Sequence, residues 1–322
     1  MSATALPLRS ISRFLRSTLS AFIKGEELDR IRAEEIDWRA LQGIVRGRNL
    51  GALFSFCHAH TSLPPPLKRE WQQMKMATSL QNLAGLKITT DLTALAEKAG
   101  IRAVAMRGIV LAHSLYPDPA LRPMHDIDLL IRPADREKFH DAMAAAGHIP
   151  TDYFRSQYVY EINNVTVEVH WQMLSNKRYR ERIDSDPLVG SAVRIDTGNS
   201  HYFRLDDQGE IIGLVVHAFT HHNLSQLFSL IDIGLYMRNK EIDWQEVARL
   251  SDEMGLSRMM HLTFAFINHL FDLGLEEKVL RHFSLPTRRA EKYFPAYLDQ
   301  TCLLYTSPSP RDRTRSRMPS SA

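Results

Sequence analysis

The chain has 322 residues, of which 44% are hydrophobic, so it can bury a sizeable core divided into two or three subdomains. It lacks any run of about 18 apolar residues, which argues against a membrane span, and with only Cys57 and Cys302 it excludes a disulfide scaffold and favours the cytoplasm. The formal net charge of +3 arises from residues 301–322, since the rest has equal numbers of basic and acidic residues, and this argues against a broad nucleic-acid-binding surface.

Helical periodicity dominates residues 1–98. The basic residues near the start would also suit a mitochondrial targeting helix, but acidic residues begin at Glu26, which favours a first structural helix. Breaks are predicted at Gly25 and at 62–66, and residues 67–98 are expected to form one or two helices. One face of the first helix would carry Leu8, Ile11, Leu15, Leu19 and Phe22.

A strand, a glycine turn and a helix are predicted next. Residues 101–106 have the composition of a short buried strand, and 109–116 can form a helix after Arg107 and Gly108. Glycine at such a junction lets the backbone approach a ligand, and the helix start presents free N–H groups. The turn would therefore suit a polyphosphate.

Two carboxylates then share one face of a predicted strand. Asp126 and Asp128 flank Ile127, and alternate strand residues point to the same side with Cα atoms about 7 Å apart. Ile127, Leu129 and Ile131 would anchor the opposite face in the core. Because two such acids repel each other unless a cation lies between them, the pattern favours Mg²⁺ or Mn²⁺.

A third acid follows on a predicted hairpin. Residues 158–162 and 165–171 are rich in β-formers and are joined by Asn163-Asn164, a pair that tolerates the positive φ of a tight turn. Glu168 lies on the polar face of the second strand with His170. If the hairpin pairs beside the Asp126–Asp128 strand, Glu168 can complete a metal site or act as a base.

These motifs occur in a distinctive order between about residues 95 and 250. They are Arg107-Gly108, Leu111, Tyr116-Pro117-Asp118, Leu121-Arg122, Asp126 to Ile131, Asp135, Gly147 and Val167 to Trp171. In this order they resemble the uncharacterised bacterial nucleotidyltransferases of the polymerase-β-like superfamily.

The resemblance implies an α+β fold, in which a small mixed β-sheet forms a nucleotidyltransferase core flanked by N- and C-terminal helical segments. It implies that Asp126 and Asp128 bind catalytic Mg²⁺ or Mn²⁺, with Glu168 as the third acid and metal ligand. The enzyme would transfer NMP from an NTP to an unidentified acceptor, namely a small molecule, a protein or an RNA end, and release pyrophosphate. Arg107 and Gly108, where the family usually has Lys-Gly, would contact the nucleotide.

Two nearby residues allow alternative interpretations. Arg122 precedes Asp126 by four residues, so it could clamp a nucleotide phosphate or pair structurally with the acids. The phosphate-binding role is favoured, since a cation beside two metal ligands would otherwise weaken metal binding. His170 could orient Glu168 or pack as an ordinary strand residue, and packing is favoured.

Helical periodicity returns after residue 206. Helices are predicted at 211–223, 227–238, from Asp243 as a cap through Leu250, and at 258–273. The expected regions are an N-terminal helical region (1–98), a nucleotidyltransferase core (99–205), a C-terminal helical region (206–300) and a Pro- and Ser-rich tail (301–322). That tail is expected to be disordered and resembles a translated sequencing adapter, so it would be non-native.

Two other function classes remain open. The first is a non-catalytic nucleotide-binding or regulatory module. The second is a histidine-metal hydrolase built on His217, His221 and His222, which have helical i, i+4 spacing. No glutamate follows His217 as in zinc proteases, so packed or substrate-facing histidines are favoured over metal ligands.

Overall fold

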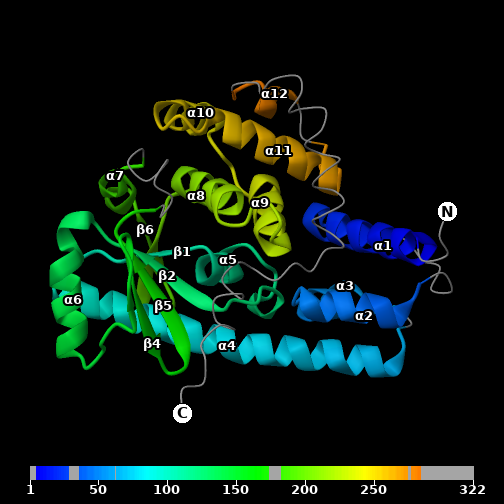
Figure 1. Ribbon diagram of the computed structural model, residues 1–322, viewed down its shortest axis with the longest axis horizontal. Helices are drawn as coiled ribbons and strands as arrows, with labels where there is room; N and C mark the ends of the chain where they lie inside the picture. The colour runs from blue at the N-terminus through cyan, green and yellow to red at the C-terminus, as the bar shows by residue number, and fades with distance from the viewer. Residues whose placement is uncertain (1–4, 29–35, 62, 174–182, 275–276, 284–322) are drawn as a thin grey trace, which may run out of the picture.

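The structure, a computed structural model, describes residues 5–28, 36–61, 63–173, 183–274 and 277–283. In this part of the chain a mixed β-sheet lies among helices from both halves of the sequence (Figure 1). The helices are α1 (Ala5–Lys24), α2 (Trp38–Gly47), α3 (Gly51–Cys57), α4 (Pro65–Lys98), α5 (Gly108–Ser114), α6 (Arg136–Ala145), α7 (Ser185–Gly190), α8 (Asp207–Thr220), α9 (Leu227–Asn239), α10 (Trp244–Glu253), α11 (Ser257–Phe271) and α12 (Glu277–Leu280). The strands are β1 (Val104–Met106), β2 (Asp126–Leu130), β3 (Asp152–Tyr153), β4 (Gln157–Ile162), β5 (Val165–His170), β6 (Val193–Asp196) and β7 (His201–Arg204).

The sheet has the strand order β3-β4-β5-β2-β1-β7-β6. Strand β2 pairs in parallel with β5 and antiparallel with β1, and β1 pairs in parallel with β7. The hairpins β3-β4-β5 and β6-β7 complete the two sides. The expected fold, a small mixed sheet with helical segments before and after it in the sequence, is therefore confirmed.

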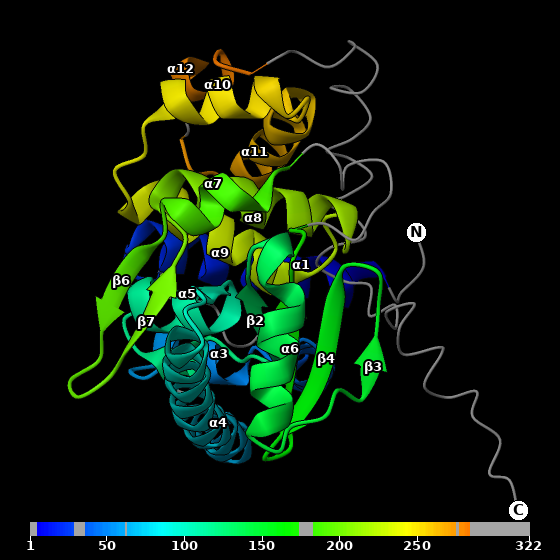
Figure 2. The same cartoon turned by 90° about the vertical axis from the view of Figure 1, so that its left-hand side faces the viewer.

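Each sheet face packs on a different hydrophobic cluster. Ile127 and Leu129 of β2 lie with Leu92 of α4 and Phe139 of α6 in one cluster. Leu130, on the other face, belongs to the cluster that includes the buried residues of α8, α9 and α11. Figure 2 shows α4 and α6 on one side of the strands and α8 and α9 above them. The alternation predicted for β2 therefore separates its apolar anchor from its acids.

The N-terminal helix is structural, as favoured from its pattern. Ile11, Leu15 and Leu19 are fully buried, and α1 lies against α9 and α11 from the other end of the chain (Figure 1). The same cluster also takes in Met106 of β1. Packing thus joins the N-terminal helical region, the core and the C-terminal helical region, while the boundaries at residues 98 and 205 stay predictions.

Most local predictions agree with the observed elements, and a few differ. The 67–98 segment is one helix that begins earlier, because Pro65 and Pro66 suit a first helical turn. Asp243 caps α10 through its side chain, as expected. Helix α8 ends at Thr220, short of residue 223, because Asn223 and Leu224 take φ values of 47° and 55°. The predicted tail, 301–322, lies outside the described residues.

The β6-β7 hairpin was not predicted from the sequence. Its strands have four residues each, and three of the four residues in β6 are exposed. Strand β6 alternates apolar and polar residues over only four positions, the shortest run in which this pattern indicates a strand, and β7 does not alternate. Within the described segments, each helix is too short or too polar to cross a membrane.

Ile127 should anchor the acid-bearing strand in the core. Ile127→Ala is expected to lower the free energy of unfolding by about 2–5 kcal/mol, because it leaves a cavity beneath β2. Ile149→Ala is the matched control, because Ile149 is 76% exposed and its loss should stay within about 0.5 kcal/mol. Urea unfolding measures both, and equal losses would contradict the assigned role of Ile127.

Candidate active site

Strands β2 and β5 carry the predicted acids side by side. Their parallel register places Asp128 opposite Glu168 and Asp126 opposite Thr166. Strand β4 pairs with β5 through a turn in which Asn163 and Asn164 have φ values of 51° and 62°. The predicted hairpin therefore lies beside β2, and since neighbouring strands are about 4.8 Å apart, Asp128 and Glu168 project together on one face.

Asp128 is the best-connected of these acids. Its Oδ1 lies 2.9 Å from His170 Nε2, and its Oδ2 lies 3.0 Å from Arg107 Nη1. The residue is buried, with 6% of its surface exposed. Burial alone would raise its pKa, but Arg107 and His170 together hold the pKa of Asp128 well below the usual range. Asp128 is therefore a buried carboxylate that keeps its negative charge.

Asp126 has the opposite electrostatic tendency. Burial, followed by the charges of Asp128 and Glu168, raises the pKa of Asp126 to about 6, although Arg107 and Arg122 oppose the shift. Carboxyl groups whose pKa values are pushed apart are typical of functional sites. A cation placed among the three acids would stabilise the ionised form of Asp126.

Glu168 and His170 complete a group that could hold a metal ion. Glu168 Oε2 accepts a hydrogen bond from Gln157 Nε2 at 2.8 Å and lies 3.5 Å from His170 Nε2. Ligand atoms of Asp128, Glu168 and His170 all lie within 4.8 Å of one another. Neighbouring ligands about 2.1 Å from one ion are about 3 Å apart, so the spacing fits a divalent cation. Asp126, a predicted ligand, lies outside this group of three.

Arg107 occupies an unusual backbone conformation at the end of β1. Its φ of 56° and ψ of −123° are rarely adopted by side-chain-bearing residues and cost about 1–3 kcal/mol. Its backbone N–H donates to Glu210 Oε1 at 3.2 Å, and its side chain reaches Asp128. The predicted turn is present and directs a guanidinium group at the acids.

Gly108 fits a confined position after this turn. A Cβ atom there would lie 3.2 Å from the Cβ atom of Met124 and 3.5 Å from Arg122 Nη1. Its nearest neighbours are therefore protein side chains, and the lack of a side chain serves packing. Nucleotide contact by Gly108 stays a prediction.

Arg122 forms an ion pair with an acid that the sequence pattern did not suggest. Its Nη2 lies 2.7 Å from Asp232 Oδ2 on α9, and Tyr116 donates to the other carboxylate oxygen at 2.7 Å. Burial opposes the charged form of Arg122, but Asp232 raises the pKa of the guanidinium further above its usual value. The structure thus gives Arg122 a structural partner 110 residues away. Its predicted contact with a nucleotide phosphate stays a prediction.

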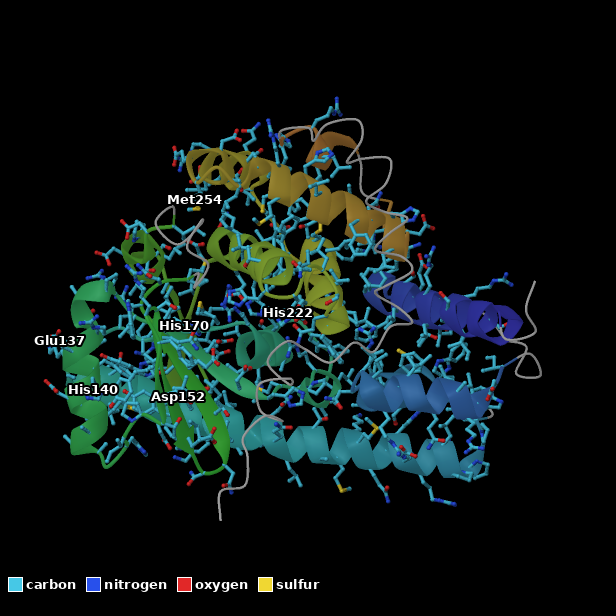
Figure 3. The ribbon with its side chains drawn as sticks, in the orientation of Figure 1. Glu137, His140, Asp152, His170, His222 and Met254 are labelled. Atoms are coloured by element: carbon cyan, nitrogen blue, oxygen red, sulfur yellow. The ribbon has the colours of Figure 1, made fainter. Side chains whose placement is uncertain are left out.

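His217 of α8 and the two histidines that follow the helix form a second cluster. His217 Nε2 lies 3.0 Å from His222 Nε2, and the His217 ring stacks on His221 at a centroid distance of 4.9 Å. Burial, then the charges of Arg107 and the neighbouring histidines, hold the pKa of His217 well below its usual value. Figure 3 shows His222 displaced from His170 along the long axis of the molecule. In the described part of the chain, the group suited to a metal is that of Asp128, not these histidines.

Comparison with known proteins identifies the family. A profile described as uncharacterised nucleotidyltransferase matches residues 34–272, which is most of the chain. The chain belongs to this nucleotidyltransferase family. No curated protein matches it.

Solved structures similar to this nucleotidyltransferase are distant. The crystal structure of ANT(2'')-Ia with adenylyl-2''-tobramycin is 13% identical with a TM-score of 0.40, and the match covers 54% of this chain and 97% of that one. A solution structure of the antibiotic-resistance factor ANT(2'')-Ia is 11% identical with a TM-score of 0.39, covering 54% and 91%. An antigenic nucleotidyltransferase-like protein from Paracoccidioides brasiliensis is 12% identical with a TM-score of 0.43, covering 62% and 94%.

Three residues of the candidate site were missed in the sequence analysis. Gln157 holds Glu168, Glu210 holds the Arg107 backbone, and Asp232 holds Arg122. Gln157 opens β4 and carried no distinguishing signal. Asp232 is the single acid within the strongly apolar run 227–236, and Glu210 directly precedes the largely apolar run 211–218. An acid at such a position is a signal that could have been used.

The strained backbone at Arg107 should lower the free energy of unfolding of this nucleotidyltransferase. Arg107→Gly should unfold with a free energy about 1 kcal/mol higher than Arg107→Ala, because glycine accepts a φ of 56° without strain. Both variants lose the guanidinium, so the ion pair with Asp128 cancels in the comparison. Chemical denaturation of the two proteins measures the difference, and a less stable glycine variant would contradict the strain.

Proposed function

We propose that this nucleotidyltransferase transfers NMP from an NTP to an acceptor and releases pyrophosphate. The main support is the placement of Asp128 and Glu168 on adjacent parallel strands, with His170 beside both. Membership of the family supports nucleotidyl transfer in general. The three acids Asp126, Asp128 and Glu168 would form the catalytic centre.

The acids suit a divalent cofactor. Asp126, Asp128 and Glu168 would hold Mg²⁺ or Mn²⁺, which prefer carboxylate oxygens, and His170 would contribute a nitrogen ligand. Such an ion, when bound, neutralises phosphate charge and polarises the α-phosphate. The distances of 2.9 and 3.5 Å from His170 Nε2 to the Asp128 and Glu168 oxygens support this ligand set.

The remaining residues position the donor and the acceptor. Arg107 would exchange its contact with Asp128 for a phosphate oxygen of the NTP, since its guanidinium lies next to the acids. Where Glu168 does not hold the metal, it would take the proton of the acceptor group while the acceptor atom attacks the α-phosphorus. The bond from the α-phosphorus to the pyrophosphate oxygen breaks, so NMP becomes attached to the acceptor and pyrophosphate departs.

One observation favours a non-catalytic alternative. Both oxygens of Asp128 are engaged by protein groups, Arg107 and His170. A carboxylate whose two oxygens are both paired with protein groups could belong to a nucleotide-binding or regulatory module. Release of pyrophosphate from a radiolabelled NTP with any acceptor distinguishes an enzyme from such a module.

The acceptor can be sought directly. We place the reaction in the cytoplasm, with a small molecule, a protein or an RNA end as the acceptor. Purified protein is incubated with each α-³²P-labelled NTP, Mg²⁺ or Mn²⁺ and a cell lysate, and labelled products are separated by size and chemistry. Transfer of label that depends on Asp128 supports the proposal, while absence of any labelled product with all four donors would count against it.

Asp128→Asn should abolish metal-dependent NMP transfer. The change removes a negatively charged ligand but keeps the side-chain volume, so the protein should still fold. Asp126→Asn is expected to have the same effect. Asp141→Asn on the exposed face of α6 is the control and should keep full activity. Full activity in Asp128→Asn would rule out the assigned centre.

Glu168→Gln should reduce the rate about 10²-fold while nucleotide binding is largely retained, as expected for a base or metal ligand. Glu161→Gln is the control on the same hairpin, since Glu161 is exposed and accepts a hydrogen bond from Thr166. Rates and nucleotide affinities are measured for both variants. Equal rates would show that Glu168 has no role in the reaction.

A further inference from the structure

Glu210 is a buried carboxylate that reaches the site from α8. It is 1% exposed, and its Oε1 accepts the backbone N–H of Arg107 at 3.2 Å. Its Oε2 is buried and has no hydrogen-bond partner among the described residues. A buried acid with one unsatisfied oxygen destabilises the fold. A role for Glu210 in the site would explain why it is buried there.

The helix that carries Glu210 is firmly held at its first turn. Asp206 accepts the N–H of Gly209 at 2.7 Å, and Asp207 accepts hydrogen bonds from Arg204 at 2.8 Å and from Tyr236 at 2.7 Å. Glu210 therefore projects from a braced element that links β7, α8 and α9. The braced first turn of α8 can therefore hold the residue that Glu210 contacts in one fixed conformation.

The partner of Glu210 is the strained residue of the site. Arg107 has a φ of 56° and a ψ of −123°, and relaxation of these angles would redirect its Cα–Cβ bond. The Arg107 guanidinium now lies 3.0 Å from Asp128 Oδ2. A contact that holds the backbone therefore also holds the direction of the side chain.

We propose that Glu210 is a positioning residue that fixes the Arg107 turn and thereby keeps the guanidinium against Asp128. Glu210 acts through Arg107, because its carboxylate accepts a hydrogen bond from that backbone N–H. The inference rests on the proposed function in one respect, since it takes Asp128 to be a metal ligand. The inference gives α8 a part in controlling how much of the negative charge of Asp128 is free to bind a metal.

The inference predicts the sign of a change in metal binding. The guanidinium of Arg107 competes with a cation for Asp128 Oδ2, so releasing the turn should tighten binding of Mn²⁺ alone. Glu210→Leu removes the hydrogen-bond acceptor and should raise Mn²⁺ affinity about tenfold, measured from the electron paramagnetic resonance signal of free Mn²⁺. If Glu210 only stabilises the fold, Glu210→Leu would leave the Mn²⁺ affinity unchanged or weaken it.

Five further variants separate the effect of the hydrogen bond from the effects of charge and of general destabilisation. Glu210→Gln keeps an acceptor without the charge and should bind Mn²⁺ like the wild type. Glu210→Asp keeps the acid but is too short to reach the N–H, so it should behave like Glu210→Leu and replaces that variant if it fails to fold. Arg107→Ala should tighten Mn²⁺ binding to a similar degree, and adding Glu210→Leu to it should have no further effect. The exposed Glu241→Leu is the matched control for removal of an acid.

Each outcome decides the proposal. Tighter Mn²⁺ binding in Glu210→Leu that disappears in the Arg107→Ala background supports it. Additive effects, equal behaviour of Glu210→Gln and Glu210→Leu, or weaker binding in Glu210→Leu would overturn it.

Failure of the proposed function would look different. If the wild type binds no Mn²⁺ at millimolar concentration, the metal site is wrong, and Glu210 is then tested by unfolding alone. Glu210→Leu should destabilise the wild type more than it destabilises Arg107→Gly, because glycine needs no support at a positive φ. Equal losses in the two backgrounds would overturn the positioning role.

Discussion

The burial of the Asp128 carboxylate is the constraint on which the site depends. A charge removed from water is stable only if opposite charges and hydrogen bonds replace the lost hydration. Arg107 and His170 supply them, one on each oxygen, and the pKa of Asp128 stays well below its usual value despite burial. The pairing keeps a negative charge at the place where a cation would be needed.

Strand register then determines which other acids join Asp128. The parallel pairing of β2 with β5 sets Glu168 opposite Asp128 and His170 two residues further along the same face. A shift of one residue would turn Glu168 into the core and Val167 toward Asp128. The fully buried Val167 and Ile127 prevent that shift, because either would lose its apolar surroundings. Burial of the apolar face of the hairpin thus fixes the register that keeps Glu168 opposite Asp128.

The C-terminal helices provide the remaining charges. Asp232 on α9 neutralises Arg122, and Glu210 on α8 holds the backbone of Arg107. Both acids are buried within helices that otherwise pack on the sheet through apolar side chains. Charged residues of the sheet region are therefore paired with charged residues of these helices. The first helix, α1, packs against α9 and α11 in the same hydrophobic core. Substitutions far from the acids in sequence can accordingly change the charge at the centre.

Local patterns in the sequence were sufficient for β2, the Asn163-Asn164 hairpin, the α10 cap at Asp243 and the shared face of Asp126 and Asp128. Each depends on residues a few positions apart, where strand alternation, turn conformation and capping follow from backbone geometry. The partners of Arg122, the support of Arg107 and the contact of α1 with α9 link residues more than 100 positions apart. Only the tertiary structure decided them, because such pairings depend on which buried surfaces meet and on which charges must then be neutralised, and periodicity carries no information about either.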